Sequence, residues 1–246
     1  MEIVKLKYKD KFIETLKTYI VSEHAKKVLN NTDYVILVGP AASGRNTIIN
    51  QLTRKYNFKF VVSDTTRPPK IRDGKKEVHG ENYYFRDELS FLKDLENGEF
   101  LEAELIHDQQ VSGTSIRELE KIQNEGLVGI NEVEFGGAKN VLKAKPGTLV
   151  FAVLPSSYKV WQERFTKREK ISKNEYMNRI RTANEVIKFI ESDRRIKVVI
   201  NHDYHEAAMI INAIVNEDYR NEGQASEIKE VINEFKTSIE ELLKDN

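Results

Sequence analysis

The chain has 246 residues, and its 39 lysines and arginines balance 39 aspartates and glutamates, so the formal net charge is zero. With this balance, the surface as a whole does not attract nucleic acid or an anionic membrane, so such a partner would need a local basic patch. The lack of cysteine excludes disulfides, thiolate metal sites and thiol nucleophiles. There is also no signal-peptide pattern and no apolar run of about 18 residues for a membrane span, so the cytoplasm is the expected compartment.

The expected secondary structure starts with an amphipathic helix over residues 10–29, where apolar side chains recur at helical spacing. Short apolar and β-branched runs then alternate with helical patterns. The runs predict strands at 34–38, 58–62, 83–86, 99–106, 127–133, 148–154 and 196–200. The patterns between them predict helices at 45–56, 87–97, 115–125, 136–144, 156–168, 173–192 and 203–216.

Apolar strands that alternate with helices are typical of a mostly parallel sheet covered by helices on both faces. The runs 83–86 and 99–106 alternate apolar and polar residues more strictly, which predicts a smaller, partly antiparallel subregion. A second amphipathic helix is expected after the polar segment 217–226. Each terminal helix has an apolar face to cover. Two alternatives stay open: both helices pack on the domain, or the C-terminal helix forms a homodimer.

The strongest local signal is the segment 34-YVILVGPAASGRNTIINQL-52, in which a buried strand passes through a glycine-containing turn into a helix. In such a loop the backbone N–H groups turn toward phosphate oxygens, and the helix N-terminus adds partial positive charge. The usual motif ends in lysine and then serine or threonine, whereas this one ends in Arg45 and Asn46, with Thr47 one place later. We predict a phosphate-binding loop whose lysine and metal-binding hydroxyl are replaced.

Five further motifs follow in chain order, namely 63-SDTTRPPK-70, 81-ENYYF-85, 98-GEFLEAELI-106, 112-SGTS-115 and 132-EVEFGGAKNV-141. Together with the phosphate loop they resemble guanylate kinases over residues 33–216. The resemblance implies a P-loop NTPase fold with a three-layer α/β/α core and a mostly parallel sheet. It also implies a small mixed α/β GMP-binding subdomain at 63–115 and a lid at 164–180. Residues 1–32 and 217–246 are then N-terminal and C-terminal helical extensions.

The resemblance implies an enzyme of purine nucleotide metabolism that phosphorylates a nucleoside monophosphate, foremost GMP or dGMP, with ATP as co-substrate and Mg²⁺ as cofactor. Asn201 would border the adenine of ATP, and the metal would lie near Asn46, Thr47 and Glu132. The ATP-binding residues that the resemblance assigns are Gly39, Ala41, Ala42, Ser43, Gly44, Arg45, Asn46, Thr47 and Asn201.

The resemblance also assigns contacts to the acceptor phosphate. Ser63, Arg67 and Tyr83 fall on positions that hold the GMP phosphate. Lys70 stands where the family has a second arginine, so it keeps the charge and loses the bidentate fork. Ser112 stands where the family has a second tyrosine, which removes one phosphate contact.

Three residues fall on the positions beside the nucleobase. Glu102 matches the carboxylate that accepts hydrogen bonds from guanine N1–H and its exocyclic amine. Adenine lacks this donor pair, so the carboxylate would be left partly unpaired with the wrong base. Thr114 and Glu134 match the other two positions.

The segment that resembles the lid is rich in arginine. Phosphoryl transfer requires cations on the migrating group and the exclusion of water, and a closing lid that carries arginines supplies both. The candidate catalytic residues are Arg45, Arg164, Arg168 and Arg179.

A second function from another class remains open. Some members of the family are scaffolds that no longer catalyse and use the GMP-phosphate pocket to bind phosphorylated protein segments. The changes at Arg45, Asn46 and Ser112 favour such a binding module, whereas the loop glycines, Glu102 and the basic lid favour the enzyme.

Overall fold

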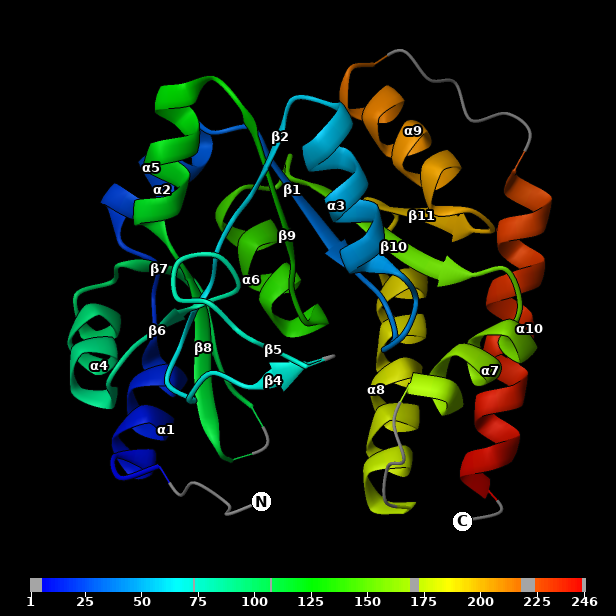
Figure 1. The fold of residues 1–246 in the computed structure, drawn as a ribbon, viewed down its shortest axis with the longest axis horizontal. Helices are drawn as coiled ribbons and strands as arrows, with labels where there is room; N and C mark the ends of the chain where they lie inside the picture. The colour runs from blue at the N-terminus through cyan, green and yellow to red at the C-terminus, as the bar shows by residue number, and fades with distance from the viewer. Residues whose placement is uncertain (1–5, 73, 107, 169–172, 218–223, 245–246) are drawn as a thin grey trace. The chain divides into compact units, whose positions relative to one another are not determined.

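The computed structural model describes residues 6–72, 74–106, 108–168, 173–217 and 224–244 (Figure 1). They fall into two compact units. The first unit comprises the described residues of 1–34, 59–131 and 139–148, and the second comprises those of 35–58, 132–138 and 149–246.

The first unit holds all or most of five helices and eight short strands. The helices are α1 (Lys9–Thr18), α2 (Glu23–Asn30), α4 (Glu88–Glu96), α5 (Ile116–Glu125) and α6 (Phe135–Ala144). The strands are β2 (Phe58–Phe60), β3 (Asp64–Thr65), β4 (Ile71–Arg72), β5 (Lys75–Lys76), β6 (Tyr84–Phe85), β7 (Phe100–Ile106), β8 (Gln110–Ser115) and β9 (Val128–Glu132).

The second unit holds three strands of a parallel sheet and five helices. The strands are β1 (Tyr34–Val38), β10 (Leu149–Pro155) and β11 (Ile196–Asn201), and the helices are α3 (Arg45–Lys55), α7 (Tyr158–Arg168), α8 (Lys173–Ser192), α9 (Tyr204–Val215) and α10 (Ala225–Lys244). Figure 1 shows α3 beside α9 and α8 beside α10, and the same helices contact each other in the structure.

The larger sheet has five strands in the order β11-β10-β1-β9-β2. Within the second unit, β10 pairs in parallel with β1 on one side and with β11 on the other. All five residues of β1 are buried, as expected for a strand that is covered on both faces. The parallel sheet and its flanking helices confirm the fold class that the sequence predicts.

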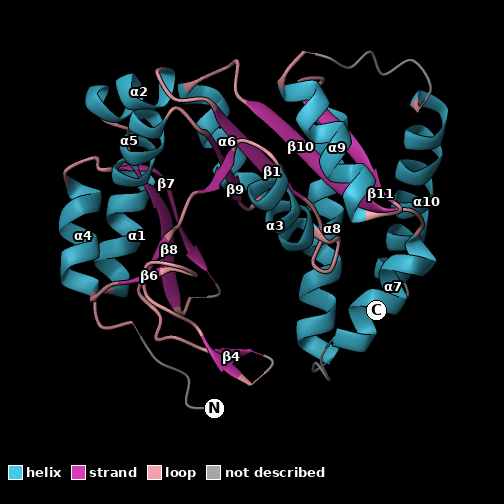
Figure 2. Ribbon diagram, turned by 45° about the horizontal axis from the view of Figure 1, so that its top comes forward, coloured by secondary structure: helices cyan, strands magenta, loops and turns pink. Residues whose placement is uncertain are grey.

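The first unit contains a second, mixed sheet in the order β6-β3-β8-β7. Strand β8 pairs antiparallel with β7 and β3, whereas β3 and β6 are parallel. Helices α1 and α4 lie side by side next to this sheet (Figure 2). The ring of Phe12 in α1 contacts the ring of Phe91 in α4, with centroids 6.0 Å apart. The partly antiparallel subregion is therefore confirmed.

The single N-terminal helix predicted over 10–29 is wrong. The structure has two helices, α1 and α2, separated by residues 19–22. Tyr19 adopts an extended conformation, and the Ser22 side chain caps α2 by accepting a hydrogen bond from Ala25 N at 3.1 Å. The apolar spacing continues across the break, but a serine can begin a new helix wherever tertiary contacts hold the preceding residue extended.

The apolar face of the C-terminal helix α10 is covered within the second unit. Val231, Phe235 and Ile239 are buried, and α10 contacts α7 and α8. The alternative in which this helix packs on its own chain is therefore confirmed. A homodimer through α10 stays a prediction and would need residues other than these three.

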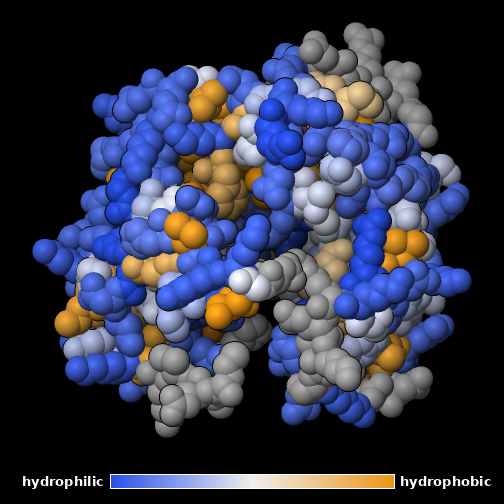
Figure 3. All heavy atoms as spheres, in the orientation of Figure 1, coloured by the Kyte–Doolittle hydropathy of each residue, from blue (hydrophilic) through white to orange (hydrophobic). Residues whose placement is uncertain are grey.

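The face of the molecule shown in Figure 3 is mostly hydrophilic, with apolar side chains at scattered positions. Among the described residues, no helix is both long enough and apolar enough to cross a membrane. The exposed large apolar side chains are Ile20, Ile71, Val78, Leu89, Tyr204 and Met209.

Candidate active site

The predicted phosphate loop connects β1 to α3 in the second unit, and two of its positions accept only glycine. Gly44 has φ +98°, and a Cβ there would lie 2.3 Å from Nδ2 of Asn201. A Cβ at Gly39 would lie 2.5 Å from the carbonyl oxygen of Val153. Between them, Ala42 has φ +64°, a conformation that costs a residue with a side chain about 1–2 kcal/mol. The loop is thus tightly turned, as a ring of inward N–H groups requires.

Two side chains from elsewhere in the second unit hold the loop through its carbonyl groups. The Asn201 amide donates to the carbonyl of Ser43 at 2.8 Å, and the Trp161 indole donates to the carbonyl of Ala41 at 2.7 Å. Asn201 is buried against the loop backbone, and its predicted position beside adenine stays a prediction.

The replaced residues Arg45 and Asn46 both face Glu132, at the end of β9. The Arg45 Nε lies 3.5 Å from a carboxylate oxygen of Glu132. With its NH₂ group oriented toward that carboxylate, Asn46 donates to the two oxygens at 2.8 and 2.6 Å. Thr47 is exposed on the first turn of α3. The structure therefore brings Asn46 and Glu132 together, with Asn46 as a donor to the carboxylate.

In the first unit, three polar side chains gather around the predicted base-reading glutamate. Thr114 donates to the Glu102 carboxylate at 2.6 Å. The Asn131 amide donates to Thr114 Oγ1 and to Ser63 Oγ, both at 3.2 Å. Asn131 therefore bridges a residue predicted to contact the base and one predicted to contact the phosphate.

Glu102 is 7% exposed, and its burial raises the pKa of the carboxyl to about 7, although the hydrogen bond from Thr114 works in the opposite direction. The hydroxyl of Tyr34 is also buried, next to Asn131 and Thr114. Burial and the nearby Glu102 raise the pKa of Tyr34, so its hydroxyl keeps its proton. A buried carboxyl whose pKa is strongly shifted by its surroundings is typical of a binding site.

The predicted phosphate contact Arg67 is occupied by an acidic partner. Its guanidinium donates to both carboxylate oxygens of Glu77, at 2.5 and 2.9 Å, and both side chains are buried. Its cationic carbon lies 4.7 Å from the ring centroid of Tyr83. Glu77 also accepts from the backbone N–H of Lys70 at 2.8 Å. Arg67, Lys70 and Tyr83 therefore lie close together, as predicted, around a carboxylate that the sequence analysis did not include.

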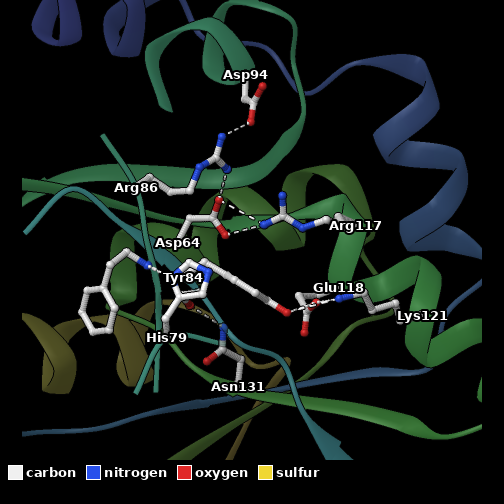
Figure 4. Close-up of polar contacts among 11 residues, drawn as sticks. Asp64, His79, Tyr84, Arg86, Asp94, Arg117, Glu118, Lys121 and Asn131 are labelled. Carbon is white, nitrogen blue, oxygen red and sulfur yellow. Dashed lines mark hydrogen bonds and ion pairs between the residues drawn. The ribbon is translucent and has the colours of Figure 1, made fainter. Parts of the chain in front are cut away.

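Asp64 and its neighbours form a second network of ion pairs in the first unit (Figure 4). The fully buried Asp64 carboxylate lies between Arg86, at 2.6 Å, and Arg117, at 2.9 Å, and Arg86 also pairs with Asp94 at 2.7 Å. These contacts join strand β3 to helices α4 and α5. Beside them, the Ser112 hydroxyl donates to Thr65 Oγ1 at 2.8 Å.

Comparison with known proteins agrees with this geometry. The profile of a family described as guanylate kinase matches residues 31–218. The guanylate kinase of Corynebacterium efficiens is 33% identical over 183 residues, which cover 74% of this chain and 93% of that protein. The chain belongs to the guanylate kinase family. It is therefore a nucleoside monophosphate kinase of the P-loop class.

Two other relatives give the same result. The guanylate kinase of Thermotoga maritima is 30% identical over 184 residues, covering 74% of this chain and 86% of that protein. The crystal structure of guanylate kinase from Anaplasma phagocytophilum superimposes with a TM-score of 0.56 at 25% identity, covering 77% of this chain and 88% of that one.

The other residues to which the resemblance assigned a role in catalysis or GMP binding lie in the second unit. Arg179 on α8 donates to Glu175 at 2.8 Å, and its guanidinium carbon lies 5.6 Å from the Phe165 ring centroid. Arg164 is half-buried on α7, Arg168 ends α7 with a side chain outside the described part, and Glu134 is exposed. Arg164, Arg168 and Arg179 therefore lie on the expected helices and Glu134 lies between β9 and α6, and the predicted roles of all four stay predictions.

Sequence reasoning missed three residues that matter to this site. Asn131 is a single amide within the buried strand β9, and that exception to an apolar run was the available signal. Trp161 is the only tryptophan of the chain, but nothing in its neighbourhood points to the phosphate loop. Glu77 lies in a stretch of charged residues that gives no sign of burial.

Proposed function

We propose that the chain transfers the terminal phosphate of ATP to GMP or dGMP in the presence of Mg²⁺. The observation that carries this proposal is the buried pair Glu102 and Thr114, joined at 2.6 Å. A carboxylate acceptor and a hydroxyl fit the guanine edge, which presents two N–H donors and a carbonyl. AMP lacks this donor pair, so it would leave the buried Glu102 carboxylate partly unpaired.

On the donor side, the backbone N–H groups of residues 39–44 and the guanidinium of Arg45 would bind the ATP phosphates. The residues near Asn46 fit magnesium, because Mg²⁺ in such enzymes takes one or two carboxylates together with phosphates and waters, and Glu132 supplies one. Bound Mg²⁺ would neutralise charge on the phosphates. Arg45 and Asn46 would have to release the Glu132 carboxylate for this.

On the acceptor side, Ser63, Arg67, Lys70 and Tyr83 would hold the GMP phosphate. Arg67 would exchange Glu77 for the phosphate, since both offer two oxygens to the guanidinium fork. No general base is required, because the attacking oxygen of GMP is already anionic. The arginines Arg164, Arg168 and Arg179 would stabilise the migrating phosphoryl group when the lid at 164–180 closes. Residues 33–216 form the catalytic domain in this proposal.

An ADP-release assay with ATP, Mg²⁺ and a panel of GMP, dGMP, AMP, CMP and UMP tests the proposal. We expect GMP or dGMP to be the best acceptor. Glu102→Gln should lower kcat/KM for GMP about 30-fold, the effect of losing a charged hydrogen-bond partner worth about 2 kcal/mol. Glu125→Gln, which removes a carboxylate from an exposed ion pair with Lys59, is the matched control and should have no effect. AMP as the best acceptor would rule out the role of Glu102.

A second function, a binding module without catalysis, is favoured by one observation. Arg45 and Asn46 both engage Glu132, so the groups that replace the usual lysine and hydroxyl compete for the magnesium carboxylate. The double variant Arg45→Lys/Asn46→Ser separates the two functions. A slow kinase should gain turnover, about 100-fold if the wild-type misplacement is about 1 Å. Absence of ATP binding in both proteins, measured by calorimetry, would establish the binding module instead.

A further inference from the structure

The C-terminal helix α10 lies beyond the part of the chain that matches the guanylate kinase family, yet it is built into the second unit. Figure 1 shows α10 alongside α8, with α7 next to both. Lys236 pairs with Glu191 of α8 at 2.9 Å, and His202, just after β11, contacts Glu227 near the start of α10. The helix is therefore fixed at several points along its length.

An aromatic contact leads from α10 to α7. Phe235, which is fully buried, packs against the ring of Trp161 with centroids 5.5 Å apart and against Tyr158 at 5.7 Å. Trp161 is also fully buried, and it stacks on Phe165 with centroids 5.5 Å apart. Burial and packing against these rings leave the indole little freedom to move.

The indole N–H of Trp161 donates to the carbonyl of Ala41 in the phosphate loop at 2.7 Å. A peptide group is planar and trans, so its C=O and the following N–H point in opposite directions. Fixing the Ala41 carbonyl toward Trp161 therefore directs the N–H of Ala42 away from it. Ala42 has φ +64°, which a residue with a side chain adopts only when its surroundings hold it there.

We infer that α10 positions the donor-phosphate loop, with Phe235 and Trp161 as the positioning residues that connect the helix to the Ala41–Ala42 peptide. Asn201 holds the Ser43–Gly44 peptide in the same way, by donating a hydrogen bond to the Ser43 carbonyl. The loop is thus supported by one residue at the end of β11 and by one that depends on α10. The inference rests on the proposed function in one respect, namely that the ligand of the loop is ATP.

The test uses the full chain with Trp161→Phe, which keeps an aromatic ring at this position, although a smaller one, and removes the N–H donor. We expect the Kd for ATP with Mg²⁺ to rise about tenfold, as for the loss of one hydrogen bond, and the Kd for GMP to change less than twofold. Tyr158→Phe is the matched control, since it removes a hydroxyl that accepts from Gln162 in the same aromatic cluster. It should change neither Kd. An unchanged ATP affinity together with a lower melting temperature would overturn the inference and leave Trp161 a purely structural residue.

Phe235→Leu tests the link to α10. It should raise the Kd for ATP about threefold. Combining it with Trp161→Phe should raise the Kd little beyond the value for Trp161→Phe alone, because the two residues act along one path. Full additivity of the two effects would contradict that path.

Hydrogen exchange separates this inference from the proposed function. In the protein without ligand, Trp161→Phe should speed exchange of the amides at Ala42 and Gly44 relative to wild type. If wild type does not bind ATP, the proposed function fails, but faster exchange in the variant still supports the positioning role. Unchanged exchange would overturn it.

Discussion

At the scale of single residues, the protonation of the buried Glu102 should depend on whether the proposed ligand is bound. The carboxyl is 7% exposed and has a pKa of about 7, because burial outweighs the hydrogen bond from Thr114. Without ligand, it is therefore about half protonated at neutral pH. The two guanine N–H groups require the ionised form, so binding should remove the proton.

The first prediction is that the Kd for guanosine rises about tenfold per pH unit as the pH falls below 7. Guanosine is used because it lacks the phosphate that titrates in the same range. Calorimetry between pH 5.5 and 8 measures the effect, and Glu102→Gln should give weaker binding that does not change with pH. The same affinity at pH 5.5 and 8 in wild type would contradict the ionised-carboxylate role.

The second prediction concerns the buried pair Arg67 and Glu77. Arg67→Ala would remove the guanidinium that donates to both oxygens of the Glu77 carboxylate, whose side chain is only 5% exposed. We expect the free energy of unfolding to fall by about 3 kcal/mol, as measured by urea denaturation. Lys70→Ala should have a much smaller effect, because Lys70 is exposed.

The double variant Arg67→Met/Glu77→Leu separates folding from binding. It should recover most of the stability, since apolar residues of similar volume often replace a buried ion pair without loss. GMP affinity should remain low, because the phosphate clamp is absent. Recovery of GMP affinity along with stability would show that Arg67 does not bind the phosphate.

At the scale of elements, the N-terminal extension holds the strand that carries Glu102. Strand β7 is at the edge of its sheet, and its pairing with β8 is irregular between Phe100 and Glu102. Tyr19 follows α1, and its hydroxyl donates to the carbonyl of Phe100 at 2.5 Å and accepts from its N–H at 3.0 Å. One side chain thus takes the place of a neighbouring strand.

The third prediction is that Tyr19→Phe lowers the free energy of unfolding by about 2 kcal/mol, since two backbone groups lose their partner. Burial raises the pKa of Tyr19 to about 12, so the hydroxyl remains a donor over the whole range of the measurement. The urea midpoint reports the loss, and amide exchange at Phe100 should become faster. Tyr8→Phe, a change in a ring on the same core cluster, is the control and should have little effect. Equal midpoints for the two variants would contradict the role of Tyr19.

At the scale of the whole molecule, the same glutamate makes stability depend on pH. The pKa of Glu102 is about 7 in the folded state and 4.5 ordinarily. As pH rises from 4.5 to 7, the unfolded chain releases this proton while the folded chain keeps it, so the contribution of the group falls. It is fully present below pH 4.5 and is lost as the pH passes through 7.

The fourth prediction is that this carboxyl lowers the free energy of unfolding by about 3 kcal/mol between pH 4.5 and 7.5. Urea denaturation of wild type and of Glu102→Gln at several pH values isolates it, because glutamine does not titrate. The difference between the two proteins should change over this window. Parallel pH profiles would show that Glu102 is ionised in the folded state already at low pH.

The sequence by itself determined the features that depend on neighbours along the chain. Bare apolar runs such as 34–38 predict buried parallel strands, because side-chain spacing repeats within a few residues. The glycines at 39 and 44 mark a loop that only glycine can form, and their spacing predicts the phosphate site. The order of the motifs was sufficient to indicate the guanylate kinase family, and Glu102, Thr114 and Ser63 do gather in one place.

Only the tertiary structure decided which groups those residues meet. Strand β8 has a sequence, QVSGTS, with little strand pattern, and it forms because β3 and β7 pair with it. The break between α1 and α2 lets Tyr19 reach Phe100, 81 residues away, and the partner of Ala41 lies 120 residues away at Trp161. Periodicity and turn residues report local conformation, whereas a hydrogen bond between distant segments depends on how the whole chain packs, which no local spacing encodes.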